Sequence, residues 1–280
     1  MAMGAMPAGE VPTTPCDRIF PSSRLYASMF VLGCIAACAA MIFFQWHRPP
    51  AAHVISAVSL LVLLLAHRMI AARFHPSNWL VRLGDDGLFI HFRSYLNEHL
   101  GAEDPTVVFL PYPDVRSARM VRERTKIRDT NHAVTTQTIR WVELELGIDP
   151  APLVAALATE SRRPGAWEKR WYGSSATLYE DYPVLMQTPP FLRVKWQVKP
   201  RASVLLDGLR QRVEIAPEVL VSEDFSDLRQ LPPEQRERRL RELNERGQTI
   251  AAVYMARMLY GCELAEATKL VQGLRRESQP

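Results

Sequence analysis

The clearest hydrophobic pattern in the chain is a pair of long apolar runs near its beginning. The first covers Leu25 to Trp46 and the second covers Ala51 to Ala72, with a turn between them that contains two prolines. The first run has no formal charge and the second contains only Arg68. A helix of ~20 residues crosses ~30 Å of hydrocarbon, so the pattern predicts two transmembrane helices. Two buried helices of a soluble domain are the alternative, although such helices normally keep a polar stripe.

Positive residues around the two runs predict the orientation of this hairpin. Arg18 and Arg24 precede the first run, and Arg68 and Arg73 lie at the end of the second. The turn contains Arg48 alone. Because positive residues favour the cytoplasmic side, we expect a multi-pass protein of a bacterial inner membrane with both termini in the cytoplasm.

Small residues in the first run allow two further interpretations. Val31 to Cys34 reads VLGC, which resembles a bacterial lipoprotein cleavage site in which Cys34 would carry the lipid. The run stays apolar beyond that cysteine, which is typical of a span. Small residues four positions apart instead predict close packing between the two helices or a homodimer; the candidates are Gly33, Cys34, Ala37 and Cys38.

After the apolar runs, the pattern changes to an alternation with a period of two. Apolar residues alternate from Trp79 to Leu83 and again from Leu88 to Phe92, on either side of an Asp-Gly pair, which predicts a β-hairpin. His91 falls on the outward face of the second strand. In TIRWVELEL the apolar face changes between Trp141 and Val142, which predicts a bulge. Other strands are expected at 107–112, 115–128, 183–187 and 191–198, and helices at 149–163 and 201–212.

These strands and the closing helix resemble the bacterial pleckstrin-homology-like domains. The segments that carry the resemblance are RLGDDGLFI, FLPYPDVRSARM and WVELEL, within residues 77–212. The resemblance implies a partly open antiparallel β-barrel that binds protein partners or lipid head groups and has no chemistry of its own. A helical insertion near 149–175 departs from the family pattern.

The last part of the chain has a helical pattern. A charged segment begins with LPPEQRERRLREL, and the following IAAVYMARMLYGCELAEATKLV is similar to the helix-turn-helix of the C-terminal domain of the bacterial ribosomal stalk protein. Tyr254 and Thr268 stand where that family places lysines, so the similarity implies a compact helical hairpin and not factor binding. The matching positions are Ile250, Val253, Arg257, Gly261, Leu264, Glu266, Ala267, Leu270 and Val271.

The predicted fold is an α+β membrane protein, with two transmembrane helices followed by a pleckstrin-homology-like antiparallel β-barrel and a C-terminal helical hairpin. Its expected parts are an N-terminal cytoplasmic tail at 1–24, the membrane hairpin at 25–72, the β domain at 73–215 and the helical region at 216–280.

Charge and aromatic patterns suggest two contact surfaces. The chain has a formal net charge of +4, and the part after the hairpin is nearly neutral, so we expect no nucleic-acid partner. A basic strip on one strand is a candidate contact for anionic lipid or a protein; an ordinary solvated strand face is the alternative. Its members are Arg116, Arg122, Arg124, Lys126 and Arg128. A second candidate contact combines Trp167, Lys169, Arg170 and Trp171. The alternative is that both tryptophans fold back onto the barrel.

The sequence shows no catalytic motif. His91, His99 and His132 have no partner at metal or nucleophile spacing, and the four cysteines show no zinc spacing. We therefore expect neither a cofactor nor a metal. The expected function is non-enzymatic: the protein scaffolds, senses or regulates a membrane complex through an unidentified protein partner. The alternatives are a module that binds anionic lipid head groups and an accessory subunit of a transporter.

Overall fold

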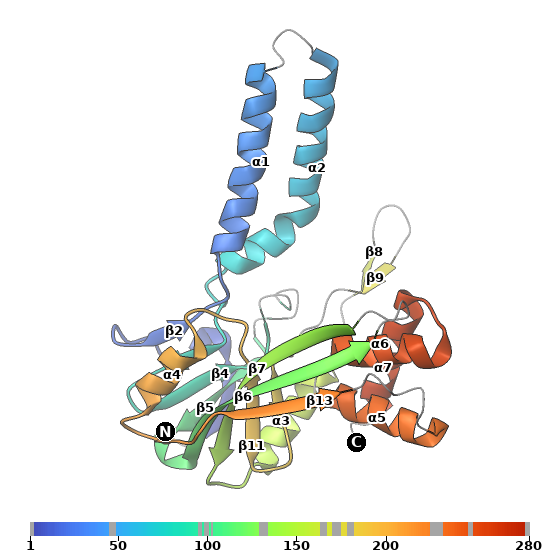
Figure 1. The fold of residues 1–280 in the computed structure, drawn as a ribbon. Helices are drawn as coiled ribbons and strands as arrows, with labels where there is room; N and C mark the ends of the chain where they lie inside the picture. Colours follow the sequence, from blue (N-terminus) through green and yellow to red (C-terminus); the bar gives the residue numbers. More distant parts are fainter. Residues whose placement is uncertain are drawn as a thin grey trace.

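A computed structural model of the chain shows an α+β fold with two main β-sheets, a projecting pair of helices and three helices at the C-terminal end (Figure 1). The structure describes residues 3–44, 49–94, 97, 101, 103–128, 134–162, 167–169, 175–177, 182–224, 232–245 and 249–277.

The elements follow one another in a mixed order of strands and helices. The strands are β1 (Gly4–Pro7), β2 (Arg18–Phe20), β3 (Val81–Leu83), β4 (Gly87–His91), β5 (Pro105–Pro111), β6 (Val115–Arg128), β7 (Val134–Leu146), β8 (Trp167–Lys169), β9 (Ser175–Thr177), β10 (Val184–Met186), β11 (Phe191–Lys195), β12 (Glu214–Ile215) and β13 (Val219–Asp224). The α-helices are α1 (Leu25–Phe44), α2 (Pro49–Phe74), α3 (Ala151–Ser161), α4 (Ala202–Leu209), α5 (Pro233–Glu245), α6 (Thr249–Tyr260) and α7 (Leu264–Glu277), and the 3-10 helices are η1 (Ala8–Glu10) and η3 (Tyr112–Asp114).

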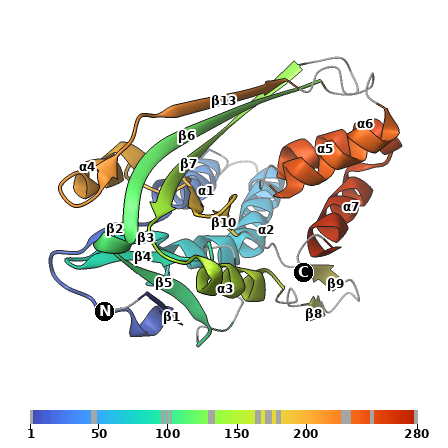
Figure 2. The ribbon, with the colours of Figure 1, turned by 90° about the horizontal axis from the view of Figure 1, so that it is seen from below.

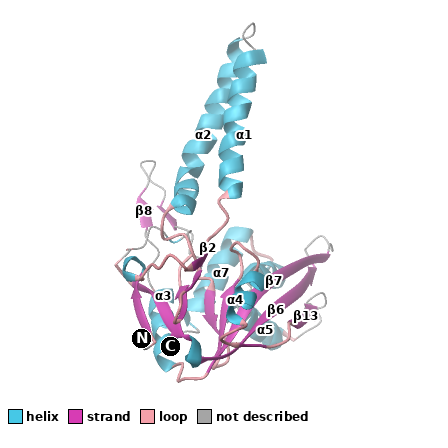
Figure 3. Ribbon diagram, turned by 90° about the vertical axis from the view of Figure 1, so that its left-hand side faces the viewer, coloured by secondary structure: helices cyan, strands magenta, loops and turns pink. Residues whose placement is uncertain are grey.

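The two apolar runs form the helices α1 and α2, which lie side by side and project from the sheets (Figure 3). On α1 the less exposed positions recur at helical spacing, at Ala27, Val31, Cys34 and Cys38, so this stripe forms the seam with α2. The base of the hairpin is tied to the rest of the fold. The Arg73 guanidinium donates to the Ser23 carbonyl at 3.0 Å, and Arg24 Nε donates to the Arg73 carbonyl at 3.2 Å.

The prediction of transmembrane helices is wrong. Among the helices in the described part of the chain, none is both long enough and apolar enough to cross a membrane. The two runs carry almost no charge, but the ends of the helices near the sheets are tied into the fold through Arg24 and Arg73. Helix α1 has 20 residues, which barely match ~30 Å of hydrocarbon, and Ala27 in its first turn is already buried. The same finding contradicts the predicted inner-membrane location and topology.

The first sheet is antiparallel and has the strand order β1-β5-β4-β3-β2. The predicted hairpin is confirmed: β3 pairs with β4, with Val81 opposite Ile90 and Leu83 opposite Leu88. Both outer strands come from residues 1–24, which the sequence analysis assigned to a tail. Residues of β1 and η1 pack on the outer face of this sheet, in a cluster with Trp79, Phe89 and Phe109. This sheet is therefore covered on both faces.

The second sheet has the order β10-β11-β7-β6-β12, and β13 also pairs with β6 in parallel. Strands β6 and β7 form a long hairpin, and β13 runs beside β6 toward the C-terminal helices (Figure 2). The register shift in β6 lies between Val115 and Ser117, so the bulge predicted at Trp141 and Val142 is absent from the described β6–β7 pairing. Trp141 and Val142 instead point to opposite faces, and both are buried.

The main core lies between the two sheets and is closed by α4. It combines residues of β3, β4 and β5 with residues of β6, β7 and β11, and Leu205, Leu206 and Leu209 of α4 pack against them. The predicted single barrel is wrong because the strands divide between separate sheets. One physical reason is that the N-terminal segment pairs with both outer strands of the β3–β5 meander, which completes a sheet of its own.

The helices α5, α6 and α7 form a separate small core. Its fully buried members include Leu240, Met255 and Val271, and the Asn244 side chain donates to the Val271 carbonyl at 2.8 Å. Helix α6 ends before Gly261, whose φ of 63° is the left-handed conformation that glycine adopts at helix ends. The predicted helical hairpin is therefore present as α6 and α7, with α5 packed against both.

Candidate functional site

The predicted basic strip on β6 is divided by the register shift at the start of the strand. Arg116 lies at the shift and pairs with Glu145 at 3.2 Å. Arg122 and Arg124 lie further along and are exposed. Lys126 is half-buried and stands opposite Asp224 of β13, and Arg128 occupies a strand position whose side chain lies outside the described residues. Only Arg122 and Arg124 are therefore brought together on an open surface.

The strand register places three other polar residues beside these two arginines. Arg122 stands opposite Arg140 of β7, and Arg124 stands between Thr138 of β7 and Ser222 of β13. All five residues are exposed. Because directly paired residues in neighbouring strands point to the same face, these side chains form one surface, which we call the arginine face.

The opposite face of the same strands is buried and holds a network of ion pairs. Arg193 of β11 donates to Glu123 at 2.5 Å and to Glu143 at 2.6 Å, and the Trp141 indole N–H donates to Glu123 at 3.0 Å. Arg119 also pairs with Glu143. Glu123 and Glu143 are 3% and 2% exposed. A buried ion pair requires such complete hydrogen bonding, so this network holds β6, β7 and β11 in a fixed arrangement behind the arginine face.

His91 lies in a buried structural position and not on an open face. Its Nδ1–H donates to the Trp79 carbonyl at 3.2 Å, and its Nε2 accepts from the Thr106 hydroxyl at 3.1 Å. Burial lowers the pKa of His91 from 6.5 to about 4, the hydrogen bond to Trp79 opposes this shift, and the charge of Arg93 adds to it. His91 does lie on the face of β4 turned away from the main core, as predicted, but the N-terminal segment and Trp79 cover that face.

Arg93, a buried arginine just after β4, connects this strand to helix α3. Arg93 pairs with Glu160 of α3, donates to Asp104 at 2.8 Å and donates to the Gly101 carbonyl at 2.8 Å. Both Arg93 and Glu160 are buried, and Arg93 is paired with the two carboxylates of the cluster. These ion pairs hold α3 against the end of β4, so we assign the cluster a structural role.

The remaining predicted site residues lie in two other places. Trp167 and Lys169 belong to the short strand β8, which pairs with β9, while Arg170 and Trp171 lie outside the described residues. In β8 successive positions alternate between the two faces of the strand, so Trp167 and Lys169 occupy one face and Glu168 the other. On α1, Cys34 and Cys38 lie in the seam with α2, whereas Gly33 and Ala37 are exposed.

The outer surface of the α1–α2 hairpin is strongly apolar. Most of the exposed large apolar side chains among the described residues belong to these two helices. Leu32 and Leu25 of α1 are 63% and 64% exposed. The full set, which we call the hairpin surface, is Leu25, Met29, Phe30, Leu32, Ile35, Phe43, Val58, Leu60, Leu61, Leu64 and Phe74.

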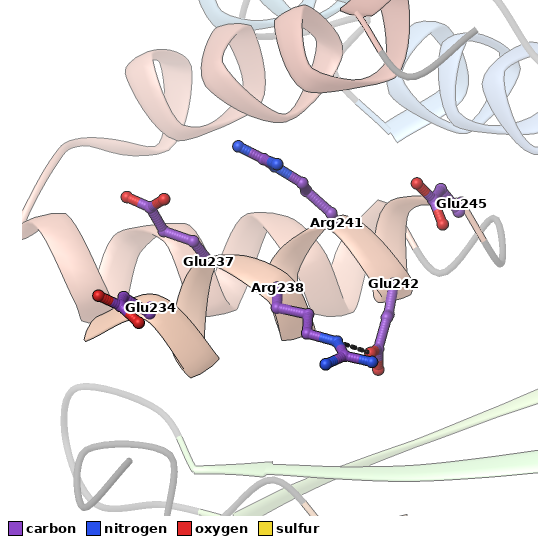
Figure 4. A pocket seen from close by; sticks show the side chains of 6 residues that line it. All are labelled: Glu234, Glu237, Arg238, Arg241, Glu242 and Glu245. Carbon is purple, nitrogen blue, oxygen red and sulfur yellow. Dashed lines mark hydrogen bonds and ion pairs between the residues drawn. The ribbon is translucent and has the colours of Figure 1, made fainter. Parts of the chain in front are cut away.

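Helix α5 carries a hollow of about 550 Å³ that is lined by charged side chains of this one helix (Figure 4). Arg238 Nε donates to Glu242 at 3.3 Å, and the other lining residues are Glu234, Glu237, Arg241 and Glu245. Long exposed side chains of both signs on one helix are typical of a solvated surface. We therefore assign no binding role to this hollow.

Comparisons with protein-family models, curated proteins and solved structures found no match to this chain. Within the ranges that the structure describes, no three or more His, Cys, Asp or Glu residues gather in a way that would hold a metal ion. The arginine face and the hairpin surface are therefore the two candidate functional sites, and both rest on the geometry of the chain itself.

Proposed function

We propose that the protein is a non-enzymatic interaction protein, and that its hairpin surface binds apolar helices of a protein partner. The observation that supports this proposal is the exposure of large aliphatic and aromatic side chains along both helices. Contiguous apolar surfaces of this kind mark interaction sites, because water is released when they are covered.

The chemistry of α1 favours a helical and apolar partner. Residues Leu25–Phe44 include no charged residue, so ion pairs contribute nothing to recognition along this helix. Exposed side chains at Met29, Leu32 and Ile35 follow the three-residue spacing of a helix ridge, which packs into the groove of a neighbouring helix. Gly33 lies on the open side, where a Cβ would meet no atom within 4 Å, so a partner backbone has room to approach closely.

The rest of the chain fits a scaffolding, sensing or regulatory role in a complex. Two sheets with a shared core and buried ion pairs provide a rigid base, and the hairpin is tied to this base through Arg24 and Arg73.

Affinity purification with matched variants tests the proposal. The full-length chain and the double variant Leu32→Gln with Ile35→Gln are compared with Leu220→Gln, which replaces a leucine of similar exposure on β13. A recovered partner is then purified and its affinity for each variant is measured by calorimetry. Burying one aliphatic side chain contributes ~1.5–3 kcal/mol, so the double variant should bind at least about tenfold more weakly, with no change for Leu220→Gln.

The outcomes of this comparison are distinct. Self-association of the purified chain that the double variant abolishes would identify the partner as a second copy, as the small residues of α1 predicted. Equal binding of the partner to the wild-type chain and the double variant would refute a role for the hairpin surface.

A further inference from the structure

The arginine face has a chemistry that the hairpin surface does not share. We propose that Arg122, Arg124 and Arg140 form a binding site for a ligand that carries a phosphate group. This site is independent of the proposed partner of the hairpin, because it lies on the β7–β6–β13 part of the second sheet.

The spacing of the three arginines follows from the strand register. Arg122 and Arg140 are direct partners across β6 and β7, so their Cβ atoms are ~4.5–5.5 Å apart. Arg124 is two residues further along β6 and points to the same side, ~7 Å from Arg122 along the strand. Three guanidinium groups on flexible side chains can therefore converge on one phosphate, and a guanidinium carries a planar pair of N–H donors that matches phosphate oxygens. Arg124 and Arg140 would bind the phosphate directly, and Arg122 would exchange the Glu218 carboxylate for it.

Two hydroxyl groups complete the set of donors. Thr138 and Ser222 stand on either side of Arg124, on β7 and β13, and both are exposed. A phosphate monoester has three acceptor oxygens and a charge near −2, so it has more acceptors and more charge than a carboxylate. Three cations and two hydroxyl groups therefore match a phosphate better than a carboxylate.

The charges of the arginine face are incompletely balanced within the described residues. Like charges directly opposite each other in a sheet are destabilising, so an anion beside Arg122 and Arg140 stabilises this pair. Glu218 pairs with Arg122, whereas Arg124 and Arg140 have no ion pair in the described part of the chain. Glu123 does not compensate them, because it lies on the buried face and is bonded to Arg193 and Trp141. An anionic ligand would supply the missing charge.

The test measures phosphate binding by the full-length chain and matched variants. Calorimetric titrations with inorganic phosphate and with pyrophosphate are made for the wild-type chain, Arg124→Gln, Arg140→Gln and Arg210→Gln. Arg210 is an exposed arginine beside α4, so its variant removes the same charge away from the arginine face. Loss of one charge-assisted hydrogen bond should weaken binding about tenfold for Arg124→Gln and Arg140→Gln, with no change for Arg210→Gln. Removal of the competing carboxylate in Glu218→Gln should strengthen binding.

A second arm identifies the source of the phosphate group. Cosedimentation with phosphatidylcholine vesicles, with and without phosphatidic acid, is measured for the same variants. Binding that requires phosphatidic acid and is lost in Arg124→Gln assigns the site to a lipid head group, and variant-sensitive binding of the soluble phosphates alone assigns it to a free phosphate ligand. Absence of binding in both arms, or equal losses in Arg124→Gln and Arg210→Gln, would overturn the proposal.

Discussion

The burial of a neutral histidine in the first sheet predicts that the fold loses stability in mild acid. The pKa of His91 is about 4 in the folded chain, chiefly because of burial, against about 6.5 for an unperturbed histidine. The unfolded chain therefore binds a proton more readily between these two values. The stability that depends on neutral His91 is fully present above pH ~6.5 and is lost as the pH falls toward ~4.

The size of this effect follows from the difference between the two pKa values. Each pH unit inside the window changes the free energy of unfolding by ~1.4 kcal/mol, so His91 accounts for a loss of ~2 kcal/mol between pH ~7 and pH ~5. Urea unfolding of the full-length chain, followed by tryptophan fluorescence, measures this loss.

A His91→Gln variant isolates the contribution of the histidine. Glutamine keeps a donor and an acceptor near Trp79 and Thr106 but does not titrate. Groups other than His91 titrate in both proteins, so their effects cancel in the comparison. The wild-type free energy of unfolding should fall by ~2 kcal/mol more than that of the variant, and equal falls would refute the assignment of His91 as a buried neutral group.

Three further substitutions, with Arg116→Met as a control for the first, test the packing of the sheets by the same unfolding measurement. Arg193→Met leaves the carboxylates of the buried network without their shared cation and should cost ~3–5 kcal/mol, whereas the exposed Arg116→Met should cost less than ~1 kcal/mol. Gly87→Ala places a Cβ against the Leu110 carbonyl and 2.8 Å from the Phe109 ring, and should cost ~1–3 kcal/mol. Trp141→Phe removes the donor to Glu123 and should also cost ~1–3 kcal/mol. Costs below ~0.5 kcal/mol for Arg193→Met or Gly87→Ala would contradict the described contacts.

Local patterns predicted the elements better than their assembly. The alternation around Asp86-Gly87 identified the β3–β4 hairpin, and the apolar runs identified two paired helices. The pattern between Trp141 and Val142 was misread as a bulge because a strand buried on both faces loses its alternation. The N-terminal strands were missed because β1 and β2 are short, and their pairing with β5 and β3 is decided by residues ~60–100 positions away.

The candidate sites could also be predicted only in part from local patterns. Arg122 and Arg124 were predicted from their spacing, but Arg140, Thr138 and Ser222 join them only through cross-strand pairing. A sequence scan that paired β6 with β7 in register would have found Arg140 opposite Arg122. The membrane interpretation of the hairpin came from its apolar composition, which does not distinguish lipid from a protein partner as the covering surface.

The most direct test of the central proposal is site-specific photo-crosslinking in cells. A photoreactive amino acid replaces Ile35 on the hairpin surface or, as a control of similar local exposure, Leu220 on β13. The proposal predicts a discrete crosslinked protein from position 35, which purified components reproduce, and none from position 220. The same crosslinks from both positions, or none from position 35, would contradict the hairpin as the site of protein interaction.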